Sequence, residues 1–110
     1  MLKIGWTTVA TAPEAETLSR RLVEDGLAVC CQVEGPISST YRWKGKIETS
    51  REFRLMVKFL PEKQSQVETV VFSQHPYDTP EWIVVNAVEV GEKYLSWARS
   101  EAQTDRFNPN

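Results

Sequence analysis

Residues 27–61 read LAVCCQVEGPISSTYRWKGKIETSREFRLMVKFLP, a run in which apolar and polar side chains alternate on either side of Gly45. A period of two predicts strands with one buried face, and glycine takes the positive φ of a tight turn without steric cost. The expected apolar faces are Ile37, Tyr41 and Trp43 before the turn, and Ile47, Phe53, Leu55, Val57 and Phe59 after it. The segment is therefore predicted to form a long hairpin, with a bulge rather than a break at Gly35 and Pro36.

Amphipathic helices are predicted on both sides of this hairpin. Thr11 and Glu14 have the spacing of a capping box, so a first helix is expected to begin there. Pro61 suits the first turn of a second helix that ends at His75, and a last helix is expected from about Glu92. The residues at helical spacing are Ala15, Leu18, Leu22 and Val23 in the first helix, and Val67, Val70 and Val71 in the second.

Two further segments are predicted to be strands. LKIGWTTVA at residues 2–10 has strand-favouring composition, and EWIVVNAVEV at residues 81–90 is apolar at odd and even positions, which predicts a strand covered on both faces. The order β-α-β-β-α-β-α indicates the α+β class. It predicts a ferredoxin-like unit with a C-terminal helix, in which two helices lie on one face of a four-stranded antiparallel sheet. The second and fourth strands would be exposed edges, so we expect closed self-association to cover them.

The composition is that of one ordinary soluble domain. The chain has 110 residues, of which 41% are hydrophobic and 25% charged, and we expect a single domain over residues 1–103 with a flexible tail at 104–110. A net charge of -2 supplies no field that attracts nucleic acid or anionic lipid. Neither a membrane-spanning run nor a secretion signal is recognisable, so the expected location is the cytoplasm.

The two cysteines, Cys30 and Cys31, are neighbours in the predicted hairpin. Adjacent residues of a strand point to opposite faces, so the two thiols are not expected to bridge to each other. Free thiols in a reducing compartment fit best. The spacing C-x-x-C is absent, which argues against a structural zinc site.

Residues 75–81, HPYDTPE, contain the only histidine of the chain. Transition metals generally need three or four ligands, so His75 alone cannot form a metal site. Such a site would also require Cys30 or Cys31, a carboxylate such as Asp78 or Glu81, or histidines from several subunits. A second possibility is a pocket at a subunit interface. The favoured interpretation is that His75 caps the second helix, because a cationic or hydrogen-bond-donating side chain is favoured at a helix C-terminus.

Aromatic and charged residues from distant segments are expected to meet in a cleft between subunits, although core and interface packing also explains the aromatic members. Lys58 is the most suggestive charged member, because it interrupts an apolar strand on the face opposite Phe59. Trp82 and Trp97 are assigned to core and subunit contacts. No serine or cysteine stands at a defined spacing from the histidine, so no enzymatic activity is expected. The expected cleft residues are Tyr41, Trp43, Lys58, His75, Tyr77 and Glu81.

Several short motifs together resemble one known family. LAVCC, SSTYRWKGKI, VKF, HPYDTPE and YLSW occur in this order across residues 2–102, and the combination is similar to the CutA divalent-cation tolerance family. The resemblance implies ferredoxin-like subunits in a homotrimer shaped like the PII nitrogen-regulatory signalling trimers, with hairpins that reach across subunit boundaries. It also implies a role in the tolerance of divalent cations, copper especially, in the cytoplasm or an organelle.

The copper ligands proposed for some bacterial relatives carry over only in part. This chain has Thr7 where the resemblance places a cysteine, Gln74 at the first histidine position and His75 at the second. Cys30 matches a cysteine of the second strand, so the candidate ligands for copper or another divalent cation are His75 and Cys30. Three functions stay open: a trimer that binds metal weakly or indirectly, a small-ligand-sensing or signalling trimer, and a structural trimerisation module.

Overall fold

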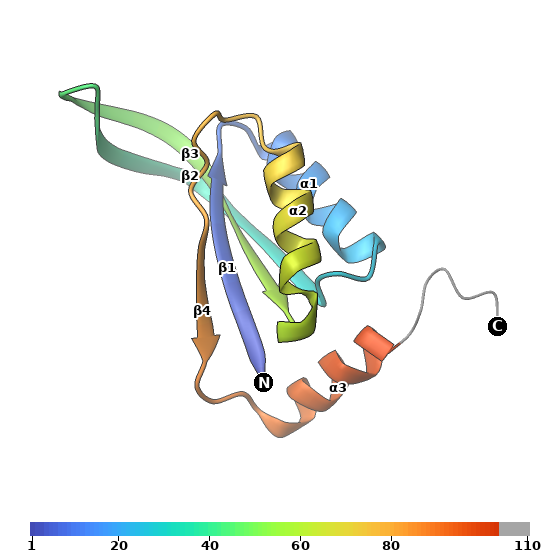
Figure 1. The fold of residues 1–110 in the computed structure, drawn as a ribbon. Coiled ribbons are helices and arrows are strands. Elements are labelled where there is room, and N and C mark those ends of the chain that lie inside the picture. Colours follow the sequence, from blue (N-terminus) through green and yellow to red (C-terminus); the bar gives the residue numbers. More distant parts are fainter. Residues whose placement is uncertain (104–110) are drawn as a thin grey trace.

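The computed structural model describes the chain through residue 103, and the tail expected at residues 104–110 lies outside the described residues. Its elements follow the predicted order, with a short 3-10 turn added before the second helix (Figure 1). They are β1 (Leu2–Val9), α1 (Ala12–Glu24), β2 (Cys30–Trp43), β3 (Lys46–Phe59), η1 (Pro61–Lys63), α2 (Gln64–Gln74), β4 (Ile83–Ala87) and α3 (Glu92–Gln103).

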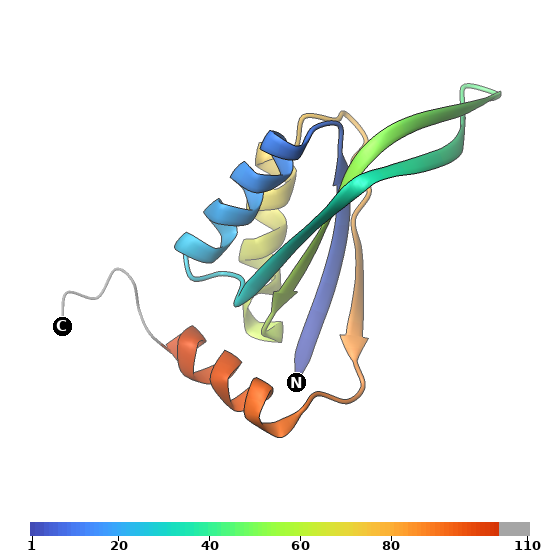
Figure 2. The same ribbon diagram turned by 180° about the vertical axis from the view of Figure 1, so that it is seen from behind.

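The four strands form one antiparallel sheet in the order β2-β3-β1-β4. The central strands are β3 and β1, and the edges are β2 and β4, as the predicted topology requires. Helices α1 and α2 cover one face of the sheet, whereas α3 lies near the end where β1 begins (Figures 1 and 2). The predicted ferredoxin-like α+β arrangement is confirmed. We call the sheet face opposite α1 and α2 the open face.

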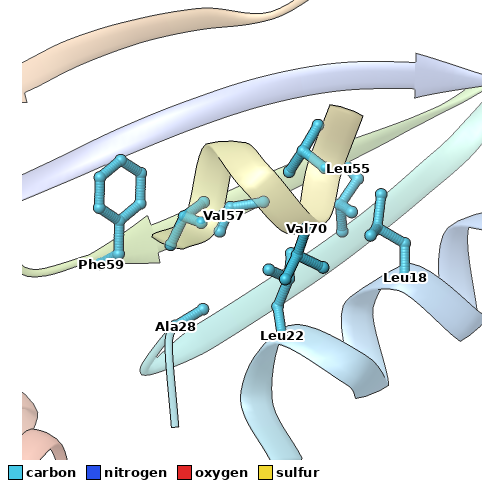
Figure 3. Packing of buried hydrophobic residues seen from close by; sticks show 9 residues of the cluster. Leu18, Leu22, Ala28, Leu55, Val57, Phe59 and Val70 are labelled. Atoms are coloured by element: carbon cyan, nitrogen blue, oxygen red, sulfur yellow. The ribbon is translucent and has the colours of Figure 1, made fainter. Parts of the chain in front are cut away.

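The main core lies between the sheet and these two helices (Figure 3). Leu22 of α1 and Phe59 of β3 are completely buried in it. Gly5 of β1 leaves space for the ring of Trp82, because a Cβ at this position would come within 2.8 Å of three ring carbons. The other buried members of the core are Leu18, Ala28, Leu55, Val57, Val67, Val70 and Val71, which include most of the positions that the helical and strand spacings predicted.

The predicted capping box begins α1. The Thr11 hydroxyl accepts a hydrogen bond from the Glu14 backbone N–H at 3.3 Å and donates one to the Glu14 carboxylate at 3.0 Å. This pair of bonds satisfies an otherwise unpaired donor of the first helical turn. It also fixes a negative charge at the start of α1, close enough to the segment after α2 to affect His75 and Tyr77 electrostatically.

The hairpin of β2 and β3 projects beyond the rest of the sheet (Figures 1 and 2). Lys44 and Gly45 both have positive φ, 51° and 81°, which is typical of a two-residue hairpin turn. The register shifts between Glu34 and Ile37, so the predicted bulge at Gly35 and Pro36 is confirmed. Ile47 does not share the buried face that its alternation predicted: it is 62% exposed, because no helix covers this outer part of the hairpin.

A second, smaller core holds α3 against the rest of the chain. Leu2, Leu60 and Ala98 are its buried members. Beyond it, Ile83 and Val85 of β4 lie on the open face and are 54% and 41% exposed. The prediction of a strand covered on both faces is therefore wrong for a single chain. None of the described helices combines the length and the apolar character needed to cross a membrane.

The two cysteines take opposite faces of β2, as alternation predicted. Cys31 packs against the main core, whereas Cys30 pairs across the sheet with Lys58 and interacts with Tyr94 of α3. Both thiols are free. Burial raises the pKa of Cys31 to about 12, an effect that a hydrogen bond with Ser19 partly opposes.

We expect the Cys31 thiol to resist alkylation in the folded protein. A thiol with so high a pKa carries almost no thiolate near neutral pH, and the thiolate is the reactive form. In a Cys30→Ser variant treated with iodoacetamide, intact mass should stay unchanged in buffer and increase by one adduct in strong denaturant. An adduct that forms equally fast under both conditions would contradict this assignment.

Candidate functional site

A hollow of about 620 Å³ opens where the hairpin leaves the sheet, and we call it the hairpin-foot pocket. Its walls come from β1, β2 and β3 and from the α2–β4 connection, residues 75–82. Four of the six residues expected in a ligand cleft, Tyr41, Trp43, Tyr77 and Glu81, are brought together here. The other lining residues are Glu52 and Asp78, with the hydroxyl-bearing Thr8, Ser39, Thr40 and Thr79.

A buried carboxylate, Glu52, lines this pocket and is only 7% exposed. Its Oε2 accepts a hydrogen bond from the Tyr77 hydroxyl at 2.8 Å, which joins β3 to the α2–β4 connection. Burial, followed by the bond to Glu52 and its negative charge, raises the pKa of Tyr77. The Tyr77 phenol therefore stays protonated, and its hydroxyl continues to donate the hydrogen bond to Glu52.

His75 lies behind the pocket, where both of its ring nitrogens are hydrogen-bonded. The Thr8 carbonyl can only accept, so Nε2 carries the proton and donates at 3.0 Å, with the Thr7 hydroxyl also 2.9 Å away. The Tyr77 backbone N–H donates to Nδ1 at 3.1 Å. The imidazole is neutral in this arrangement, and the lone pair on Nδ1 accepts the hydrogen bond from the Tyr77 amide. It therefore acts as a bridge between β1 and the corner after α2.

His75 is at the C-terminal end of α2, as expected, but it is a neutral donor rather than a cation. The residue is at the C-cap position, but its ring turns away to β1. Burial lowers its pKa below the ordinary value of 6.5, although the Thr8 carbonyl and the charges of Glu14 and Glu52 oppose the shift.

Stability should decrease with acidification because of His75. The unfolded chain takes up a proton near pH 6.5, whereas the folded chain resists it, so stability falls as the pH drops below 6.5 toward the lowered pKa and then levels off. A His75→Gln variant keeps a donor at the Nε2 position but does not titrate. Its melting temperature should fall less between about pH 7.5 and pH 5 than that of the wild type. Equal decreases in the two proteins would contradict the neutral assignment.

Cys30, the other candidate metal ligand, lies far from His75 along the sheet. Cys30 pairs across the sheet with Lys58, which in turn pairs with Ile4 near the start of β1. His75 instead contacts Thr7 and Thr8 near the end of β1. Over the part of the chain that the structure describes, no group of three histidine, cysteine or acidic residues could hold a metal ion. Within one chain, His75 and Cys30 therefore do not form the metal site that the resemblance implied.

Lys58 is not part of the pocket in a single chain. It lies six residues beyond Glu52 along β3, a separation of roughly 20 Å at the rise of a strand. Its Nζ lies 5.5 Å from the centroid of the Tyr94 ring, a cation–π contact with α3. Lys58 lies on the same strand face as Glu52, but within one chain it is not brought together with the other expected cleft residues, so its place in a cleft between subunits stays a prediction.

The two tryptophans assigned to packing differ in their surroundings. Trp82 stacks on Phe59 with 6.4 Å between ring centroids, and its indole N–H donates to Glu68 at 3.0 Å. Trp97 lies 5.4 Å from Tyr94 and is 43% exposed. Trp82 is therefore a partly buried residue that packs against the main core, whereas Trp97 lies on the surface of a single chain.

Comparison with known proteins agrees with this fold. A family profile described as "CutA1 divalent ion tolerance protein" matches residues 3–101. The chain is 33% identical over 99 residues to the divalent-cation tolerance protein CutA of Thermus thermophilus, covering 90% of this chain and 96% of the relative. It is 39% identical over 93 residues to the corresponding protein of Archaeoglobus fulgidus, with coverage of 84% and 89%.

Solved structures of the same family also superpose on this chain. The CutA structure from Xylella fastidiosa superposes with a TM-score of 0.88 at 35% identity, covering 93% of this chain and 98% of that one. A structure from Archaeoglobus fulgidus, described as a periplasmic divalent cation tolerance protein CutA, has a TM-score of 0.88 at 32% identity, with coverage of 94% and 100%. Fold and sequence therefore agree on one family.

Proposed function

Because this chain belongs to the CutA1 divalent ion tolerance family, we propose that it contributes to the tolerance of divalent cations, copper among them, as a homotrimer. The main support for the proposed homotrimer is the uncovered apolar part of the sheet, where Ile83 and Val85 of the edge strand β4 are largely exposed. Tyr94 and Trp97 of α3 add further exposed aromatic surface. Apolar edges are a liability for a lone chain, and a closed assembly of copies covers them.

At micromolar concentration the protein should have three times its chain mass of 12.6 kDa by light scattering after gel filtration. A Val85→Lys substitution places a charge on the exposed apolar edge, and we expect it to shift the distribution toward smaller species. A wild-type mass equal to one chain would contradict the proposed assembly.

The metal role that we propose is weak or indirect. Both ring nitrogens of His75 are occupied, and the described residues of one chain do not gather three suitable ligands. We propose no catalytic reaction, because Thr7, whose hydroxyl contacts the histidine, is completely buried and inaccessible to a substrate. The free cysteines favour a reducing compartment, so we propose the cytoplasm.

A second candidate function is that of a small-ligand sensor, with metal tolerance as a downstream effect. The hairpin-foot pocket favours it, because three aromatic and three acidic side chains converge there from separate elements. A volume of about 620 Å³ is within the roughly 300–1,000 Å³ that is usual for small-molecule sites. The pocket lies beside the projecting hairpin, so a bound ligand could alter the hairpin's contacts.

Growth under copper stress tests these proposals. A strain that lacks its own family member should recover copper tolerance with the wild type and with His75→Gln. The sensor function predicts that Trp43→Leu, which changes the pocket wall at a half-exposed residue, restores tolerance poorly. Full rescue by Trp43→Leu would argue against the sensor, and failure of the wild type to rescue would argue against the tolerance role itself.

A further inference from the structure

We infer that the hairpin-foot pocket binds a small organic cation through a primary ammonium or guanidinium group. The inference rests on the sensor function proposed for the same pocket, and it adds the chemical class of the ligand. It follows from the carboxylates, the aromatic rings and the ion pairs around the pocket.

The acidic side of the pocket is not neutralised by the part of the chain that the structure describes. Glu52, Asp78 and Glu81 line it, and no lysine or arginine among residues 1–103 does. The ion pairs among the described residues all lie elsewhere, at Arg20–Glu24, Arg21–Asp25 and Arg54–Glu34. Three carboxylates around one hollow repel one another at neutral pH, and a cation placed between them removes that repulsion.

Glu52 is the buried member of the three carboxylates, whereas Asp78 and Glu81 are exposed. Glu52 is more than nine-tenths buried, yet its hydrogen bond from Tyr77 comes from a neutral hydroxyl. Buried carboxylates are usually paired with a cation, because desolvation of an unpaired charge is costly. Glu14 adds to the negative potential at this corner, since its charge also acts on Tyr77.

Aromatic rings supply the second half of a cation site. In a single chain Tyr41 and Trp43 are 42% and 50% exposed, so the chain's own residues leave parts of both rings accessible to a ligand. The Tyr41 hydroxyl is 3.3 Å from the Ser50 hydroxyl, a contact within the hairpin that helps to hold the ring in place. Ammonium and guanidinium groups bind over such rings, whereas an anion would be repelled by the ring faces and by the carboxylates.

The same lining argues for an organic cation rather than a bare metal ion. A metal ion needs several ligand atoms converging on one point, and the carboxylates here do not form a group of that kind among the described residues. An ammonium or guanidinium group needs only one carboxylate and an adjacent ring. The hydroxyls of Thr8, Ser39 and Thr79 can bind the rest of a small polar molecule.

Calorimetric titration with probes of matched length tests the charge requirement. We would compare 1,4-diaminobutane, 1,4-butanediol and succinate at constant ionic strength, and add tetramethylammonium as a probe of the aromatic wall. The diamine and tetramethylammonium should bind, and the diol and the dianion should not. Repeating the titrations at higher salt should weaken diamine binding.

Two variants locate the binding. Glu52→Gln keeps the shape and an acceptor for Tyr77 but removes the charge, and it should weaken diamine binding about tenfold or more. Glu62→Gln makes the same change at an exposed residue of η1 and should leave affinity unchanged. Trp43→Leu, at a half-exposed site where folding is not threatened, should weaken tetramethylammonium binding about threefold or more.

The outcomes separate the two proposals. Cation binding that is lost in Glu52→Gln and Trp43→Leu and retained in Glu62→Gln supports the inference. Binding of succinate or the diol in place of the cations would overturn the cation inference but leave a ligand-binding pocket. If none of the four probes binds, or if cations bind all variants equally, the inference is overturned. The copper-growth assay with Trp43→Leu then decides the sensor function separately.

Discussion

Replacing Phe59 by alanine should reduce the free energy of unfolding by about 3 to 5 kcal/mol, the usual cost of removing a buried aromatic side chain. Phe59 is completely buried at the end of β3 and stacks on Trp82. Its removal would leave a cavity between the central strand and α2, which the surrounding side chains can fill only in part. Urea denaturation at a fixed protein concentration measures the change, because assembly makes stability concentration-dependent.

Phe72→Ala is the matched control for this prediction. The same side chain is deleted, and Phe72 also contacts Trp82, with 6.4 Å between ring centroids, but it is 51% exposed. A half-exposed ring transfers less apolar area from water, so its loss should cost clearly less than that of Phe59. Similar losses for the two variants would mean that the described core is packed differently.

Replacing Tyr77 by phenylalanine should destabilise the protein by about 1 to 3 kcal/mol, the usual cost of leaving a buried polar group without its partner. Only the hydroxyl is removed, and with it the 2.8 Å hydrogen bond to Glu52. The Glu52 side chain belongs to a residue that is 7% exposed, so it would be left buried without this donor. The variant should also open the hairpin-foot pocket, because this bond joins β3 to the α2–β4 connection.

Tyr41→Phe supplies the control for Tyr77→Phe. It removes a hydroxyl from the same pocket, but that hydroxyl belongs to a 42% exposed residue and lies 3.3 Å from the Ser50 hydroxyl, so water can replace the contact. We expect its denaturation midpoint to stay close to that of the wild type. Equal effects of the two substitutions would show that Glu52 does not depend on the Tyr77 hydroxyl.

The parts of the fold that could be predicted from the sequence depend on local spacing. The Thr11–Glu14 cap, the turn at Gly45 and the bulge at Gly35 are each set by residues within a few positions of one another. The same holds for the opposite faces of Cys30 and Cys31, because side chains alternate along any strand. The strand order then followed from the order of the elements and the rules of layer packing.

The site could be predicted only in part, because its contacts are not local. Glu52 was not singled out: its alternation marked it as an ordinary polar residue, and its partner Tyr77 is 25 positions away. The only signal was a carboxylate on the strand face shared with Tyr41. The protonation state of His75 could not be predicted from the sequence either, since it depends on where Thr8 and the Tyr77 amide lie in the folded chain.

The central claim is that His75 is a structural bridge and that the working site is the hairpin-foot pocket. Thr7 and Gln74 occupy the other two positions at which the resemblance expected copper ligands, which agrees with this view. Metal tolerance would then depend on what the assembled protein binds in the pocket rather than on a metal held by one chain.

Calorimetric titration with copper tests this claim most directly. The wild type, His75→Gln and a Cys30→Ser, Cys31→Ser double variant should be compared as assembled proteins under identical conditions. If His75 is a bridge, His75→Gln will leave the heat and stoichiometry of any copper binding unchanged, and the double variant will do the same. Loss of copper binding in His75→Gln, with the fold intact by circular dichroism, would contradict the account.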